Sequence, residues 1–174
     1  MTRRRPSLLT AATALLALLL GAAGGCLQGT PARIDAPADP AAGEVPFELI
    51  GPNDAAIVVQ VEIHGEGPFD LVVDTGATFT CLDESLADRL ELPDAPGIGF
   101  GAGIGGGGRM RVVQIESLKI GETTAHDLLG CAVDLRHLQD LPGFDVDGLL
   151  GLNLLKSFRV TLDFERQVLR LEPI

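Results

Sequence analysis

The sequence predicts a mostly β domain, a compact barrel or sandwich of many short strands with two small helices. Three observations support this fold class. Apolar and polar residues alternate in several separate stretches, as they do in strands with one buried face. Residues typical of turns separate these stretches at short, even intervals. Helix-forming patterns occupy only two short segments, and the 174 residues allow one such domain.

The first strongly β-like stretch covers residues 56–64, where β-branched side chains alternate with polar ones. Residues 65–68, Gly-Glu-Gly-Pro, have the composition of a turn. A second apolar stretch, residues 69–73, then leads into Asp74. Together these segments predict a β-hairpin with one buried face. The folded domain is expected to begin shortly before them, near Val45.

The middle of the chain combines a helix with further strands. Residues 83–90 predict a short helix, because Asp83 can cap its N-terminus and two leucines share one face. Residues 97–108 then hold eight glycines in twelve positions. Residues 109–121 and 123–135 return to the composition and alternation of strands.

The C-terminal part is predicted to contain a loop, a short helix and two strands. Residues 138–145 have the composition of a loop, with Pro and Gly adjacent. Residues 149–151 are an apolar pair and a glycine that lead into a short helix over residues 152–158. Residues 159–164 and 167–171 then form two strands joined by a tight turn.

Residues 71–78 carry the motif with the clearest chemical meaning. An apolar strand delivers Asp74 into a tight turn, where Gly76 permits a backbone approach that a Cβ atom would block. Thr75 supplies a hydroxyl group beside the carboxylate. Such a tripeptide alone is more typical of a turn that ends a strand than of a catalytic site. The elements around it therefore decide its meaning.

The stretch from Asp74 to Thr78 resembles the Asp-Thr-Gly-Ala-Thr/Ser signature of aspartic proteases. As in that family, two apolar residues precede the aspartate and a small residue follows the glycine. The resemblance implies that Asp74 is the catalytic acid and that the next four residues support the active site, namely Thr75, Gly76, Ala77 and Thr78.

Two further elements extend this resemblance over residues 45–174. The glycine-rich segment resembles the flap hairpin of retroviral-type members, with flap positions at Gly101, Gly103, Gly105 and Gly106. Residues 147–155 resemble the closing element of the same proteases, in which an apolar pair and a glycine precede a short helix. The resemblance therefore implies a retropepsin-like closed barrel with one or two short helices and a single lobe.

Aspartic proteolysis needs two carboxylates around one water molecule, one ionised and one protonated. Two such charges ~4 Å apart repel by ~4 kcal/mol at an effective dielectric constant of ~20, so the pair shares one proton. The chain has one Asp-Thr-Gly and the length of one lobe. An active enzyme must therefore be a homodimer in which Asp74 of each chain meets at a two-fold axis and Thr75 hydrogen-bonds across it. The substrate would be a polypeptide.

A non-catalytic alternative stays open on the same fold. Such a protein would hold extended peptides or proteins by strand pairing without cutting them. Other classes are disfavoured by composition: the net charge is −11, so nucleic acid is not an expected partner. The three histidines lack the spacing of metal ligands, and neither a metal nor another cofactor is expected.

The N-terminus resembles that of a bacterial lipoprotein. Residues 1–25 contain three arginines, a 13-residue apolar stretch and a run of small residues, which predicts an export signal peptide. The residues before Cys26 resemble a lipobox, which implies lipid attachment at Cys26 and a place in the cell envelope, on the periplasmic or extracellular face of a bacterial membrane. Simple secretion and an uncleaved membrane anchor remain as alternatives.

Residues 26–44 contain three prolines and no apolar period, which predicts a flexible tether between this attachment and the domain at 45–174. Removal of residues 1–25 takes away three arginines and changes the net charge from −11 to −14. Such an acidic surface would be repelled by anionic membrane lipids, so the lipid attached to Cys26 must hold the protein at the membrane.

Cys81 and Cys131 are the two thiols of the predicted domain. Export permits a disulfide between them. The sequence does not show whether their Cα atoms lie within bonding range, so two buried free thiols and one disulfide both remain open.

Overall fold

A computed structural model describes residues 32–39, 43–95, 101–102, 109–139 and 142–174. Its eleven strands are, in chain order, β1 (Arg33–Asp35), β2 (Glu44–Ile50), β3 (Ala56–Ile63), β4 (Glu66–Val73), β5 (Thr80–Asp83), β6 (Gly101–Ala102), β7 (Arg109–Ile120), β8 (Thr123–Val133), β9 (Gly148–Leu150), β10 (Phe158–Asp163) and β11 (Val168–Pro173). Its helices are α2 (Glu84–Arg89), α3 (Arg136–Gln139) and α4 (Leu152–Leu155). Residues 31–174 form one compact unit.

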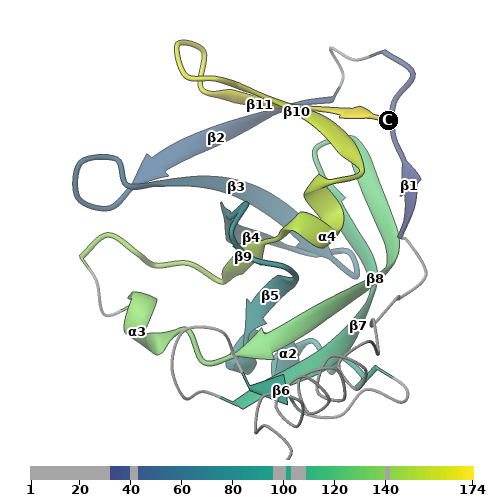
Figure 1. The fold of residues 1–174 in the computed structure, drawn as a ribbon, viewed down its shortest axis with the longest axis vertical. Coiled ribbons are helices and arrows are strands. Elements are labelled where there is room, and N and C mark those ends of the chain that lie inside the picture. The colour runs from purple at the N-terminus through teal and green to yellow at the C-terminus, as the bar shows by residue number, and fades with distance from the viewer. Residues whose placement is uncertain (1–31, 40–42, 96–100, 103–108, 140–141) are drawn as a thin grey trace, which may run out of the picture. The chain divides into compact units, whose positions relative to one another are not determined.

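Six of these strands close into a barrel (Figure 1). β3 pairs with β4 on one side and with β7 on the other. From β4 the ring continues through β9, β5 and β8 back to β7. β2, β11 and β10 extend the sheet outward from β3 in that order. The predicted fold class, a mostly β closed barrel with short helices, is confirmed.

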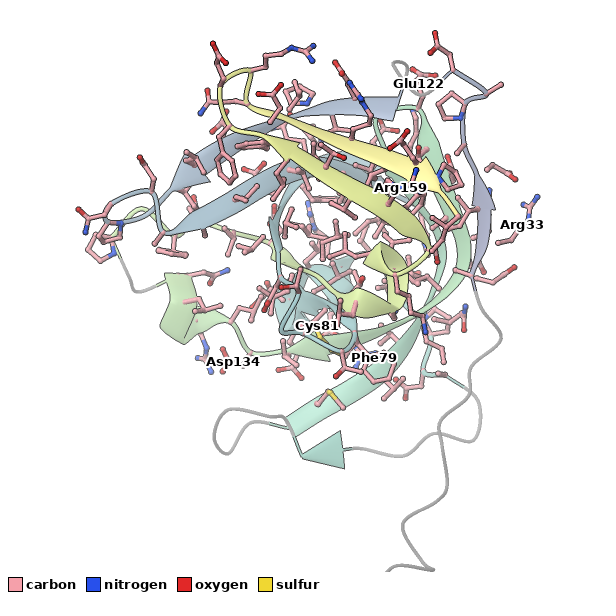
Figure 2. The ribbon with its side chains drawn as sticks, turned by 45° about the horizontal axis from the view of Figure 1, so that its top comes forward. Arg33, Phe79, Cys81, Glu122, Asp134 and Arg159 are labelled. Carbon is pink, nitrogen blue, oxygen red and sulfur yellow. A yellow bond between two sulfur atoms is a disulfide. The ribbon has the colours of Figure 1, made fainter. Side chains whose placement is uncertain are left out.

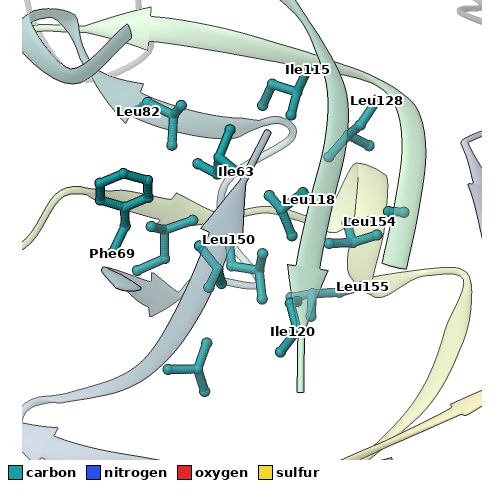
Figure 3. Packing of buried hydrophobic residues seen from close by; sticks show 14 of the residues in the cluster. Ile63, Phe69, Leu82, Ile115, Leu118, Ile120, Leu128, Leu150, Leu154 and Leu155 are labelled. Atoms are coloured by element: carbon teal, nitrogen blue, oxygen red, sulfur yellow. The ribbon is translucent and has the colours of Figure 1, made fainter. Parts of the chain in front are cut away.

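The barrel is filled by the side chains that the alternating strands turn inward. In β3, for example, Val59, Val61 and Ile63 are at most 2% exposed, whereas the intervening Gln60 and Glu62 face solvent. Figure 3 shows how the strands of the barrel and α4 contribute to one apolar cluster, which includes Ile63, Leu82, Ile115, Leu118, Leu150 and Leu154. Burial of such a side chain contributes ~1.5–3 kcal/mol, so this cluster supports the barrel.

β5 and β1 lie at places where no strand was predicted. β5 is buried at all four positions, and a strand buried on both faces carries no period-two pattern. β1 lies within the predicted tether and pairs with β8, so this part of the tether is docked on the sheet. α3 adds one helical turn across the start of the predicted loop.

Within the described residues, no helix is long and apolar enough to cross a membrane. The predicted signal peptide, residues 1–25, and Cys26 lie outside the described residues.

Candidate active site

The Asp74 loop, residues 74–79, connects β4 to β5 across the end of β9. β9 lies between these two strands: it pairs in parallel with β4, where Val73 faces Leu150, and antiparallel with β5, where Cys81 faces Leu149. The predicted motif and the predicted closing element are thus brought side by side, although more than sixty residues separate them in the sequence. The loop is held at the end of the barrel by both of its flanking strands.

Three backbone hydrogen bonds fasten the Asp74 loop to β9 and α4. The N–H of Asp74 donates to the carbonyl of Leu150 at 3.0 Å. The N–H groups of Leu152 and Asn153 donate to the carbonyls of Ala77 and Thr78 at 2.8 and 3.1 Å. The first turn of α4 therefore uses its free N–H groups to hold the loop, which satisfies groups that a helix cannot pair internally.

Two glycines of the closing element are required by close packing. A Cβ atom at Gly151 would lie 2.3 Å from the backbone carbon of Phe79, and one at Gly148 would lie 2.4 Å from the carbonyl oxygen of Cys81. Both distances are far below a van der Waals contact, and both involve backbone atoms that cannot move aside easily. The glycines thus let β9 and α4 approach the chain that leads out of the Asp74 loop.

Next to the loop, Asn153 anchors a partly buried polar network. Its side-chain oxygen accepts hydrogen bonds from the N–H of Thr80 at 2.8 Å and from the Thr80 hydroxyl at 3.1 Å. Its amide nitrogen donates to the carbonyl of Leu129 in β8. The Thr80 hydroxyl in turn accepts from the N–H of Gly151 at 3.2 Å. This network joins α4 to β5 and β8, and it includes Gly151, which connects β9 to α4.

Neither Asn153 nor Thr80 carries a sequence pattern that assigns it a role. Thr80 is fully buried, and a buried hydroxyl must find partners within the protein. A polar residue, Asn153, on the short helix of the closing element is the one sequence feature that indicates such a network. Its partner, Thr80, can be identified only from the fold.

The carboxylate of Asp74 is fixed through one of its oxygens. Oδ1 accepts a hydrogen bond from the N–H of Gly76 at 2.8 Å, and the loop is closed by the N–H of Ala77 donating to the Asp74 carbonyl at 3.3 Å. Asp74 is half-buried, while Thr75, Gly76 and Thr78 are exposed. Within the described part of the chain, neither Oδ2 of Asp74 nor the Thr75 hydroxyl has a hydrogen-bond partner. This arrangement leaves one carboxylate oxygen and one hydroxyl available to a water, a substrate or a second protein.

Only part of the predicted flap can be compared with the structure. Gly101 lies in β6, which pairs antiparallel with the start of β7, where Gly101 faces Met110. Gly103, Gly105 and Gly106 lie outside the described residues.

The Cys81 and Cys131 thiols form a disulfide, one of the two alternatives left open by the sequence. The two residues are direct partners in the parallel pairing of β5 with β8, and their Cα atoms are 4.4 Å apart. Figure 2 shows Cys81 close to Phe79, where the Asp74 loop ends. The disulfide therefore fixes the strand into which the loop runs.

Asp83 ends β5 and caps α2, as the sequence predicted. It accepts hydrogen bonds from the N–H and hydroxyl of Ser85 and from the N–H of Leu135. Burial raises the pKa of Asp83, but these hydrogen bonds together outweigh it and hold the pKa below its ordinary value. Among the described residues, no cluster of three or more His, Cys, Asp or Glu is arranged to hold a metal ion.

The chain resembles several known proteins in sequence. It is 29% identical over 121 residues to DNA damage-inducible protein 1 of Phaeosphaeria nodorum, covering 68% of this chain and 25% of that protein. It is 32% identical over 118 residues to the UBA domain-containing protein Mud1 of Schizosaccharomyces pombe, covering 66% of this chain and 32% of that protein. The similarity thus spans about a third or less of each relative.

The fold is also known from a solved structure. A crystal structure of a retropepsin-like aspartic protease from Rickettsia conorii matches with a TM-score of 0.52 and 18% identity, covering 80% of this chain and 92% of that one. The predicted retropepsin-like fold is thereby confirmed. The family model for aspartyl protease matches residues 59–154, which include the Asp74 loop, β9 and most of α4. Since this match covers more than half of its residues, the chain belongs to the aspartyl protease family.

Proposed function

We propose that this protein is an aspartic endopeptidase that is active as a homodimer, with Asp74 of each chain in one shared site. The observation that carries the proposal is the geometry of the Asp74 loop. Its base is fastened to β9 and α4, and Gly76 orients the carboxylate, while Oδ2 stays available. A firmly held carboxylate with one free oxygen is what a general acid or base requires.

In the proposed mechanism, the two Asp74 carboxylates share one proton and bind one water molecule between them. The ionised carboxylate takes a proton from the water as its oxygen attacks the carbonyl carbon of the peptide bond. The protonated carboxylate donates a hydrogen bond to the carbonyl oxygen, on which negative charge develops. Collapse of the tetrahedral intermediate breaks the C–N bond, and the amine leaves with a proton from the pair.

The homodimer is supported by what one chain contains. The sequence has one Asp-Thr-Gly, and the second carboxylate must come from another copy. Thr75, next to Asp74, is exposed, and its hydroxyl is unbonded in the described part of the chain. Such a hydroxyl is suited to a hydrogen bond across a two-fold axis, where it would hold both loops in register.

We further propose that the protein is attached through lipid on Cys26 to a bacterial membrane, on its periplasmic or extracellular face. The basic residues, apolar stretch and small residues before Cys26 support this attachment. The Cys81–Cys131 disulfide is consistent with an oxidising compartment outside the cytoplasm.

The test is hydrolysis of a peptide library by the purified chain between pH 3 and 7, at concentrations where its oligomeric state is measured. We expect Asp74→Asn to lower the rate by at least ~10²-fold, the lower range of general acid–base catalysis. Asp54→Asn, which changes an exposed acid in the β2–β3 turn, is the matched control and should leave the rate unchanged. Equal rates for Asp74→Asn and wild type would refute the proposal. A dimer that binds peptides without hydrolysing them would favour the non-catalytic alternative.

A further inference from the structure

β1 is a short strand that the chain adds to its own barrel from the predicted tether. It lies outside residues 59–154, the part that the family model matches. Its three residues pair antiparallel with β8: Arg33 faces His126, Ile34 faces Ala125 and Asp35 faces Thr124. Figure 1 shows β1 beside β8, on the outer side of the barrel.

Several contacts hold this segment, residues 32–35, which we call the strap. Ala32 and Ile34 are partly buried and pack against the apolar cluster of the barrel. Oδ2 of Asp35 lies 3.0 Å from Nε2 of His126. Arg33 projects outward and forms an exposed ion pair with Asp35 at 3.3 Å (Figure 2). The apolar contacts and the strand pairing therefore hold the strap, because exposed ion pairs contribute little.

Among the described residues, the strap is the only segment that pairs with this part of the β8 edge. The neighbouring part of this edge is already occupied: Gly130 to Val133 pair with β5, and the carbonyl of Leu129 accepts from Asn153. Residues 124–126 would otherwise present unpaired backbone groups to solvent. Docking of the strap satisfies these groups within one chain.

Docking of the strap shortens the free chain that follows Cys26. From Cys26 to Glu44, at the start of β2, a fully extended chain would span ~60 Å. From Cys26 to Arg33 the same geometry allows only ~24 Å. A domain whose strap is docked can therefore move less than half as far from its attachment point as the tether alone would permit.

We propose that the strap confines the protease domain to the membrane surface and so selects its substrates: extended polypeptide segments close to the membrane, rather than segments far from it. This inference rests on the proposed peptidase function and on attachment through Cys26. Confinement to the membrane surface is required neither by the peptidase function nor by the attachment, because a freely extended tether would be compatible with both.

The test uses the chain from Cys26 onward, coupled through that cysteine to phosphatidylcholine vesicles that carry a maleimide lipid. Peptides are anchored in the same vesicles, with the scissile segment on either a short or a long spacer. We expect at least ~10-fold faster cleavage of the near peptide, because effective concentration vanishes where a tether cannot span the distance. Ile34→Asp, which places a charge where Ile34 packs against the barrel, should make the two cleavage rates equal, whereas Ile34→Val should not.

Two further measurements make the result decisive. A flexible insertion of twelve residues after Leu27 should increase the distance that the domain can move from Cys26, while the strap stays docked. Hydrolysis of a soluble peptide should be equal in all variants, which shows that the site is intact. Equal cleavage of the near and far peptides by the vesicle-coupled wild-type chain would overturn the inference but would not contradict the peptidase function.

If no peptide is cut, the peptidase function fails, and hydrogen exchange then tests the strap by itself. In an antiparallel pair only alternate amides bond across the pairing, so only some of the amides in residues 33–35 and 124–126 depend on the strap. Those amides should exchange at least ~10-fold more slowly in the wild type than in Ile34→Asp. Equal exchange rates in the two proteins would overturn docking of the strap.

Discussion

The base and the tip of the Asp74 loop are built in opposite ways. At the base, where the loop runs into β5, Thr80 is fully buried. Its hydrogen bonds to Asn153 link it to α4 and β8, and its hydroxyl also accepts from the N–H of Gly151. At the tip, Thr75 and Gly76 are exposed, and the Thr75 hydroxyl has no partner within the described residues.

This difference separates two tasks within one chain. The base fixes the position of Asp74 through contacts that a single chain supplies in full. The tip keeps polar groups unpaired, which costs little only while water or another molecule satisfies them. Changes at the base are therefore expected to reduce stability, whereas changes at the tip are expected to affect association and catalysis.

Removal of the disulfide should have the largest effect. Cys81 and Cys131 are separated by 50 residues, and the chain-entropy model assigns ~4 kcal/mol to a loop of this length. We expect the double variant Cys81→Ala/Cys131→Ala to lose about that amount in urea unfolding. Since the variant also lacks both thiols, a control with intact cysteines under reducing conditions should show a similar loss. Equal stability of oxidised and double-variant protein would contradict this expectation.

Replacement of Asn153 should come next. Asn153→Leu leaves the N–H and hydroxyl of Thr80 and the carbonyl of Leu129 without this partner. We expect a loss of ~3 kcal/mol, since each buried group left unsatisfied costs ~1–3 kcal/mol and some will find water.

Calorimetry would detect this loss as a decrease in Tm of ~10 °C, at ~2–4 °C for each kcal/mol in a domain of this size. Leu152→Ala is the matched control on the same helix, because Leu152 is 41% exposed and should change stability little. Equal Tm values for Asn153→Leu and this control would show that the network does not hold the base.

Acid should weaken the barrel at two carboxylates away from the site. Hydrogen bonds from Arg166 and Arg170 lower the pKa of Glu44 from its ordinary 4.5 to about 2, and the pKa of Asp83 also lies below its ordinary 3.8. Both groups bind fewer protons when folded, so their contribution is present above pH ~4.5 and is lost as the pH falls toward ~2.

Unfolding in urea at pH 7, 5, 4 and 3 would measure this loss. Glu44→Gln should flatten the decline, because it removes one of the two titrating groups. A free energy of unfolding that rises as the pH falls through this range would contradict the assignment. The result also tells whether low activity near pH 3 reflects the site or the fold.

The sequence contains most of what is needed to predict the barrel, and much less of what is needed to predict the base of the loop. The hairpin of residues 56–73 was predictable because one of its faces is buried. Apolar residues therefore recur at every second position, as Val59, Val61 and Ile63 do. The Asp74 motif and the closing element could be recognised as sequence patterns. Their contact through Asn153 and Thr80 depends on a register that no local pattern encodes.

The strap escaped prediction for a related reason. Its strand has three residues, and only Ile34 among them is apolar, which is too short a stretch for any period to appear. Prolines on both sides favour an extended chain, but they do not identify the edge of β8 as its partner. Long-range pairing decides structure here, and composition alone suggested a tether.

Thr75 provides the smallest expected change in stability and the sharpest test of the contrast. Thr75→Val keeps the shape of the side chain and removes only the hydroxyl. If that hydroxyl makes no hydrogen bond within its own chain, the free energy of unfolding of the monomer should change by less than ~0.5 kcal/mol. If it bonds across a two-fold axis, sedimentation should show weaker dimerisation, and hydrolysis should fall in parallel. A large loss of monomer stability would instead mean that the hydroxyl serves its own chain, and the tip would then belong with the base.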